Sequence, residues 1–155
     1  MENYAVSIVI KWIHLMATVA WIGGMFTNFF IYLPVIGKVL DPPTTGKLLG
    51  TAMKRFRVLV YISMGLLLLT GILRGFISEF PSESLWTIIF FIKIGVFVIM
   101  VFLAIYAFEI LAPKVTKLAA NGPSPELLRI QKSQMSLAII GLILGIIILA
   151  LTAAL

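Results

Sequence analysis

Four long apolar segments account for most of the chain, and short segments rich in proline, glycine and charge separate them. The apolar segments cover residues 4–36, 56–77, 85–111 and 127–155. A helix needs about 20 apolar residues to cross the hydrocarbon core of a bilayer, so each segment is long enough to span it. The pattern predicts an all-α integral membrane protein, folded as a four-helix bundle in a single domain over residues 1–155.

Turn-forming residues mark the connections between these segments. The sequence DPPTTG at 41–46 is expected to end the first helix, and the sequence NGPSPE at 121–126 precedes the fourth. Within the latter, Ser124 is suited to cap a helix, Pro125 to occupy its first position and Glu126 to face its positive end.

The charged residues predict an orientation in the membrane. Basic residues gather around the first and third connections: Lys38, Lys47, Lys54, Arg55 and Arg57, then Lys114, Lys117, Arg129 and Lys132. The second connection has Arg74 against Glu79 and Glu83. By the positive-inside rule the basic connections are cytoplasmic, so both termini face outward. This placement fits a multi-pass protein of the cell's inner (cytoplasmic) membrane, and it explains the net charge of +6 without a nucleic-acid partner.

The composition of the chain excludes several kinds of protein and of functional site. Hydrophobic residues make up 61% of the chain and charged residues 12%, which no soluble domain of this length accommodates. The absence of cysteine excludes disulfides, thiolate metal sites, iron–sulfur clusters and covalently attached c-type haem. There is also no carboxylate pair, phosphate-binding loop or second histidine for a zinc site.

Two ionisable side chains interrupt the apolar segments at membrane depth. The single histidine, His14, lies about ten residues into the first segment and Lys93 about nine residues into the third, so a rise of about 1.5 Å per residue gives them similar depths in the outer half of the bilayer. An ionisable group at this depth usually faces a bundle interior and has a function. We therefore expect a pocket that contains both residues.

Helical periodicity places the polar residues of each segment on one face. The stripe on the first segment consists of Lys11, His14, Thr18, Trp21, Met25 and Asn28. The second segment presents Ser63, Thr70 and Arg74, and the third Trp86, Lys93 and Met100. We expect these faces to point inward, with His14, Trp21, Arg74 and Lys93 as the binding residues of the pocket, while Lys11 extends to the headgroups.

The role of His14 is open at this point. It could bind haem iron, bind copper, carry protons, or only donate a hydrogen bond to a neighbouring helix. Haem held by two histidines of one chain is impossible, so a sixth ligand would be Lys93, a methionine or a group from a second protomer. The scattered methionines favour packing over a copper path, and proton conduction lacks an acidic relay.

The order of these residues resembles the copper-resistance D (CopD) superfamily of integral membrane proteins. The similar elements are WIHL at 12–15, AWIGG at 20–24, RFR at 55–57, LTGI at 69–72, and a Lys93 helix that ends near Ala112-Pro113. The same pattern is similar to four-helix membrane protoporphyrinogen oxidases of the HemJ type, which carry an early histidine, a following tryptophan and a later lysine. The resemblance implies haem b at His14 with redox chemistry, or copper handling as the alternative.

A competing hypothesis is a small non-catalytic accessory subunit of a larger membrane complex. Gly141 and Gly145 have the spacing that lets a helix approach closely. Their partner could be a helix of the same chain, a second protomer of a homo-oligomer or another subunit. In this hypothesis His14 is only hydrogen-bonded.

Overall fold

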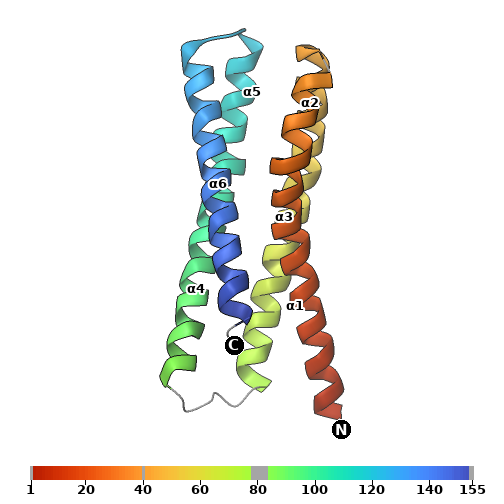
Figure 1. Ribbon diagram of the computed structural model, residues 1–155, viewed down its shortest axis with the longest axis vertical. Coiled ribbons are helices and arrows are strands. Elements are labelled where there is room, and N and C mark those ends of the chain that lie inside the picture. The colour runs from red at the N-terminus through yellow and green to blue at the C-terminus, as the bar shows by residue number, and fades with distance from the viewer. Residues whose placement is uncertain (1, 40, 78–83, 154–155) are drawn as a thin grey trace. The chain divides into compact units, whose positions relative to one another are not determined.

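A computed structural model describes residues 2–39, 41–77 and 84–153, and the elements within these ranges are all helices. The chain divides into two compact units, Met1–Phe80 and Pro81–Leu155, and each is a helical hairpin (Figure 1). The candidate spans are Tyr4–Ile36, Thr44–Arg74, Thr87–Ala120 and Pro125–Ala153. The all-α class and the four apolar helices of membrane-spanning length are confirmed.

The first hairpin is built from α1 and α3. Helix α1 (Glu2–Thr27) continues through a π-helical segment, η1 (Asn28–Tyr32), into α2 (Leu33–Val39). Helix α3 (Pro42–Ile77) then returns alongside α1, and the two helices pack against each other.

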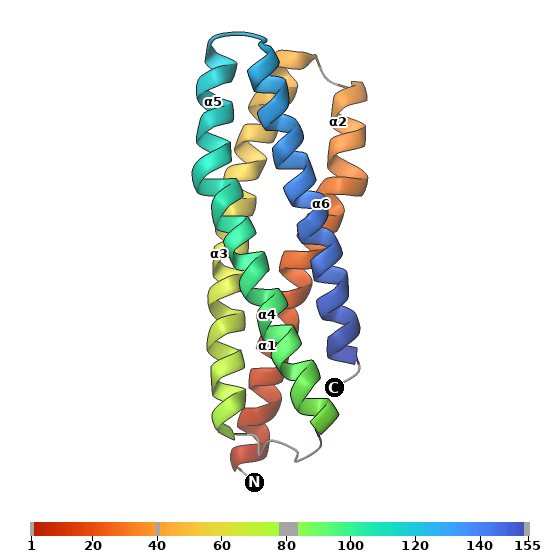
Figure 2. The ribbon, with the colours of Figure 1, turned by 90° about the vertical axis from the view of Figure 1, so that its left-hand side faces the viewer.

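The second hairpin repeats this plan. Helix α4 (Ser84–Ile105) continues through the π-helical segment η2 (Tyr106–Leu111) into α5 (Ala112–Ala120). Helix α6 (Pro125–Ala153) returns and contacts α4, η2 and α5. Figure 2 shows the turn that joins α5 to α6.

The segment 41–46 begins a helix, whereas the sequence analysis gave it to a connection and began the second helix near residue 56. Helix α3 starts at Pro42 because Asp41 caps it: the Asp41 carboxylate accepts the Thr44 N–H at 3.1 Å, and the Asp41 carbonyl accepts the Thr45 N–H at 2.9 Å. Prolines are tolerated in a first helical turn because their missing N–H groups would have no partner there. The hydrogen bonds from Thr44 hold the pKa of Asp41 below its usual value.

The expected helix end near Ala112-Pro113 was also wrong, because the helix runs on to Ala120. Each π segment ends two residues before a proline, Tyr32 before Pro34 and Leu111 before Pro113. A proline inside a helix has no N–H to donate and clashes with the carbonyl four residues earlier. A π turn widens the helix, so the chain continues without a break.

The turn between α5 and α6 agrees with the sequence prediction. The side-chain oxygen of Ser124 accepts the Leu127 N–H at 3.1 Å, and Pro125 is the first residue of α6. Gly122 has φ +91°, a left-handed conformation that glycine adopts readily. Both return helices therefore begin with the same device, a capping side chain followed by proline.

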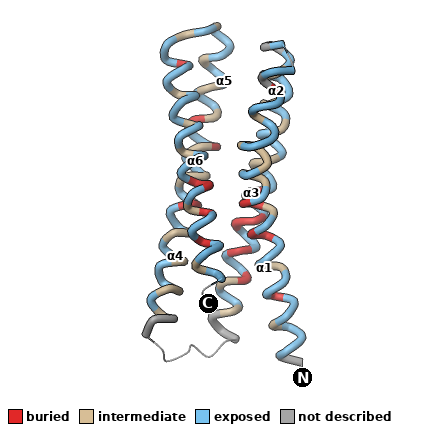
Figure 3. Tube along the Cα trace, viewed as in Figure 1, coloured by how far each residue is buried: buried red, intermediate tan, exposed pale blue. Residues whose placement is uncertain are grey.

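The helices expose most of their apolar side chains. In the most hydrophobic 18-residue windows of the four spans, 28%, 22%, 6% and 17% of the residues are buried. Figure 3 shows buried positions confined to short stretches of otherwise exposed helices. Apolar surface on this scale is stable only against lipid, so the structure describes a multi-pass membrane protein.

Candidate functional site

His14 of α1 is hydrogen-bonded to Thr70 of α3. The His14 Nδ1 atom lies 2.7 Å from Thr70 Oγ1, and the bond joins the two helices of the first hairpin. Both residues come from the polar faces that helical periodicity predicted. The histidine is half-buried, and Thr70 is 2% exposed.

The partners of Thr70 settle the direction of this bond. The single hydroxyl proton of Thr70 is donated to the Leu66 carbonyl at 2.6 Å, one turn back on α3. Towards His14 the Thr70 oxygen is therefore an acceptor, and Nδ1 of His14 is the donor. A neutral imidazole with its proton on Nδ1 carries its lone pair on Nε2. Metal-binding histidines are commonly fixed in this way, with one ring nitrogen donating to the protein.

The other residues of the polar stripe on α1 are buried or half-buried, except for Lys11. Thr18 and Trp21 are buried, at 8% and 3% exposure, and the Thr18 hydroxyl donates to the His14 carbonyl at 2.8 Å. Met25 and Asn28 are half-buried, while Lys11 is exposed. That Lys11 extends to the headgroups stays a prediction.

The α3 face supplies a buried hydroxyl and a cation. Ser63 is 2% exposed. Arg74 is half-buried and lies one helical turn after Thr70, in the last turn of α3. The hairpin thus combines the His14 imidazole with three buried hydroxyl side chains, those of Thr18, Ser63 and Thr70, and carries the Arg74 guanidinium one turn beyond Thr70.

Lys93 belongs to the second hairpin. It lies on α4 and is half-buried, and Met100, two turns further along, is 3% exposed. The predicted convergence of Lys93 with His14 stays a prediction. The side chain of Trp86 is not among those that the structure describes.

A cavity of about 360 Å³ on the first hairpin does not include His14 in its wall. Its lining is mainly apolar and comes from both helices: Trp12, Ile13, Met16, Ala17, Ala20, Leu59, Ile62, Ser63 and Leu66. A group bound at His14 Nε2 would therefore lie outside this cavity.

Within the described residues, no three side chains of the histidine, cysteine, aspartate and glutamate types gather to hold a metal ion. A metal that brings its own ligands needs only one from the protein, and the oriented imidazole of His14 can provide it.

Comparison with known proteins gives a family. Residues 16–124 match the model of a domain of unknown function, DUF4149. The chain belongs to this family. No curated protein and no solved structure matches the chain.

The DUF4149 match covers Trp21, Thr70, Arg74 and Lys93, whereas His14 lies two residues before it. Helical spacing placed Thr70 on the polar face of its segment but did not identify it as the partner of His14. A signal was present, since α1 and α3 are antiparallel and both residues lie towards the end of the hairpin that holds Glu2 and Ile77. The same comparison of depths that paired His14 with Lys93 would have paired it with Thr70.

Proposed function

We propose that this DUF4149 protein binds haem b within the membrane, and that His14 would bind the iron through Nε2. The observation that carries the proposal is the hydrogen-bond chain from His14 Nδ1 to Thr70 Oγ1 and on to the Leu66 carbonyl. It orients the ring, and in a neutral imidazole it leaves the lone pair on Nε2, which a metal ligand requires. The resemblance to the CopD and HemJ-type proteins supports the same assignment.

Haem fits the residues better than a bare metal ion. The porphyrin supplies four nitrogen ligands, so the protein needs to add only one or two. The described residues contain no cluster of three histidine, cysteine or acidic side chains, and one oriented histidine is what they offer. When bound, haem b supplies an iron that exchanges one electron between its ferrous and ferric states.

The other residues have proposed supporting roles. Arg74 lies one turn from Thr70 and would pair with a haem propionate, since a guanidinium binds a carboxylate with two parallel hydrogen bonds. Trp21 is buried on the His14 face and would keep that face apolar and closed to water. Lys93, the other residue expected to bind the group, lies on the second hairpin, and its role stays a prediction.

The proposed setting is the inner (cytoplasmic) membrane, with both termini outside and the basic ends of the hairpins in the cytoplasm. The support is the distribution of charge. Lys38, Lys47, Lys114 and Lys117 lie on the segments next to the two hairpin turns, and all four are exposed. The positive-inside rule assigns such ends to the cytoplasm.

An absorption spectrum tests this function. The full chain is expressed with a haem precursor, purified in detergent, and measured oxidised and reduced. We expect a Soret band in the wild type and in Lys11→Ala, whose side chain is exposed one turn before His14, and no Soret band in His14→Ala. If the wild-type protein is colourless and binds one copper ion, and His14→Ala does not bind copper, the cofactor would be copper instead of haem.

An accessory role in a larger membrane complex is the second candidate, and α4 favours it. Its span is the most apolar of the four, with a mean hydropathy of 3.0, and only 6% of its most hydrophobic window is buried. Gly141 and Gly145 were expected to contact another subunit or a second protomer. Both glycines are already buried within the single chain. A colourless, metal-free protein that co-purifies with larger subunits and keeps its stability in His14→Ala would establish this role instead.

A further inference from the structure

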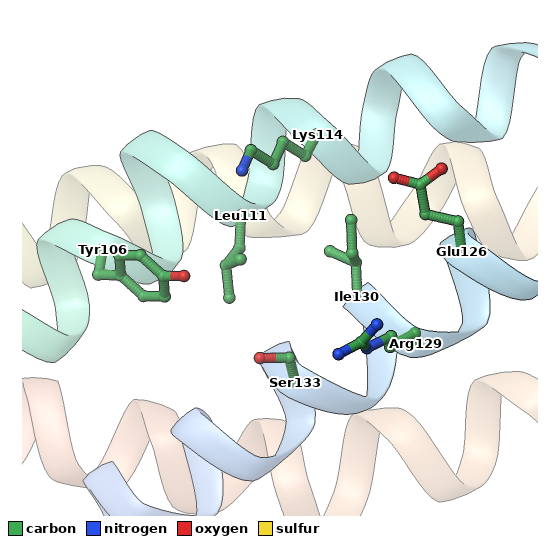
Figure 4. Close-up of a pocket in the computed structure, with 7 residues that line it drawn as sticks. All are labelled: Tyr106, Leu111, Lys114, Glu126, Arg129, Ile130 and Ser133. Carbon is green, nitrogen blue, oxygen red and sulfur yellow. The ribbon is translucent and has the colours of Figure 1, made fainter.

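The second hairpin contains a pocket of about 260 Å³ near its turn, built mainly from polar side chains. It is lined by η2, α5 and α6 through Tyr106, Leu111, Lys114, Glu126, Arg129, Ile130 and Ser133 (Figure 4). We call it the basic pocket. The π turn of η2 contributes Tyr106 and Leu111 to it, so the irregular part of the helix forms one side of the pocket.

The basic pocket holds two cations against one anion. Figure 4 shows Glu126 at one end and Tyr106 at the other, with Lys114, Arg129 and Ser133 between them. Neither Lys114 nor Arg129 forms an ion pair within the part of the chain that the structure describes. The net charge of the lining is positive, which suits a singly charged anion.

The floor of the pocket is apolar. Leu111 is 4% exposed, and Ile130 is half-buried. The hydroxyl groups of Tyr106 and Ser133 line the same space. The pocket therefore offers positive charge and hydroxyl donors over a hydrocarbon surface, which is the chemistry that recognises an amphiphile with an anionic head.

The position of the pocket along the hairpin matches a membrane surface. Residues 94–108 and 137–155 carry no charge, and the pocket-lining cations Lys114 and Arg129 lie just beyond these stretches on the side of the hairpin turn. Because charged side chains begin where the hydrocarbon core ends, the pocket lies at the level of the headgroups. Pockets of this kind on the cytoplasmic side of membrane helices recognise anionic lipid headgroups.

We propose that the basic pocket binds the phosphate of an anionic phospholipid of the surrounding leaflet. Lys114 and Arg129 contact the phosphate oxygens, and the guanidinium of Arg129 can donate two parallel hydrogen bonds to it. The hydroxyl groups of Tyr106 and Ser133 meet the glycerol part of the lipid, while the first acyl carbons pass Leu111 and Ile130.

The test is native mass spectrometry of the full chain in detergent, titrated with short-chain phosphatidylglycerol. Phosphatidylcholine of the same chain length and inorganic phosphate serve as comparison ligands. We expect phosphatidylglycerol to bind at least about tenfold more tightly than phosphatidylcholine, because its charge is not balanced within the headgroup. Inorganic phosphate at the same concentration is expected not to displace it.

A double variant, Lys114→Gln with Arg129→Gln, is expected to weaken phosphatidylglycerol binding about tenfold. The matched control is Lys117→Gln with Lys132→Gln, which removes the same charge from exposed positions of α5 and α6 outside the pocket lining. The control is expected to change affinity by less than about twofold. Tyr106→Phe, which removes one hydroxyl, is expected to weaken binding by a few-fold.

Two outcomes would overturn the proposal. Equal weakening in the two double variants would mean that diffuse positive charge, rather than a pocket, attracts the lipid. Displacement by an equal concentration of inorganic phosphate would mean that the site takes a soluble phosphate compound. His14→Ala is expected to leave lipid binding unchanged, so this test stands apart from the haem assignment.

Discussion

His14 donates from Nδ1 to Thr70 Oγ1 across 2.7 Å, joining α1 to α3 within the membrane-spanning part of the first hairpin. The bond is directional because the Thr70 hydroxyl proton is already donated to Leu66. In an apolar surrounding such a bond both holds the two helices together and sets the tautomer of the ring. The proposed chemistry depends on the second effect.

Thr70→Val separates these two effects. Valine has the shape of threonine but no hydroxyl, so the ring of His14 loses its acceptor while packing is kept. Loss of such a supporting partner typically lowers metal affinity about 10- to 100-fold. We expect that loss in haem affinity, measured by following the Soret band as haem is titrated into the apoprotein.

Thr18→Val is the control for that variant. Thr18 is buried like Thr70, but its hydroxyl donates to the backbone carbonyl of His14 and leaves the ring untouched. Haem affinity is expected to stay within about threefold of wild type, since the tautomer of the ring is preserved. Equal losses in the two variants would show that Thr70 acts only on packing.

Gly24 and Gly23 test the packing of α1 on α3. A Cβ at Gly24 would lie 2.7 Å from Cε2 of Phe56, whereas one at Gly23 would meet nothing within 4 Å. Gly24→Ala forces the Phe56 ring to move, so we expect it to be less stable than Gly23→Ala by about 1–2 kcal/mol. Thermal unfolding in detergent measures the difference. Equal melting temperatures would mean that the ring turns aside freely.

Asp41 gives the start of α3 a dependence on pH. Hydrogen bonds from Thr44 hold its folded pKa below its ordinary value, so its charged form stabilises the helix start above the unfolded pKa, and this contribution is lost as the pH falls through the folded pKa. Amide hydrogen exchange at Thr44 and Thr45, relative to the unfolded rate, is expected to accelerate as the pH falls below the ordinary pKa of aspartate. In Asp41→Ala it is expected to be fast at all pH values.

Asp41→Asn is the control, because asparagine keeps a capping oxygen without a titrating group. Protection of the Thr44 amide is expected to persist in this variant and to lose its pH dependence. A wild-type protection that does not change with pH would contradict the role of the carboxylate.

The orientation of the chain can be tested with single cysteines, since the sequence contains none. Lys47→Cys and Lys117→Cys lie on exposed positions near the two hairpin turns. Both are expected to react with a membrane-impermeant maleimide only from the cytoplasmic side, and Glu2→Cys only from outside. Reaction of Lys47→Cys from outside would reverse the proposed topology.

The apolar spans were readable from the sequence because membrane crossing demands length and hydropathy, and both are local. The start of α3 was missed because the prolines at 42 and 43 were read as breakers, although Asp41 before them and Thr44 after them form a capping pattern. The π segments were missed because a wide turn leaves no mark on hydropathy. Pro34 and Pro113, inside otherwise helical stretches, are their only local sign.

The candidate site was predicted in part. The polar stripe on α1 follows from helical spacing alone, and Thr18 and Trp21 are buried as that spacing suggests. The partnership of His14 with Thr70 depends on how α1 and α3 are aligned, which spacing within one helix does not encode. For the same reason the sequence indicated Lys93 by depth but could not show what lies next to it.

Chemical rescue of His14→Gly tests the central claim most directly. The substitution removes the proposed iron ligand and leaves room for imidazole supplied in solution. We expect that His14→Gly lacks the Soret band of the wild type. Added imidazole is expected to restore haem binding to His14→Gly but not to a His14→Phe variant, whose ring fills the space. A His14→Gly protein that keeps its haem without imidazole would show that His14 does not bind the iron.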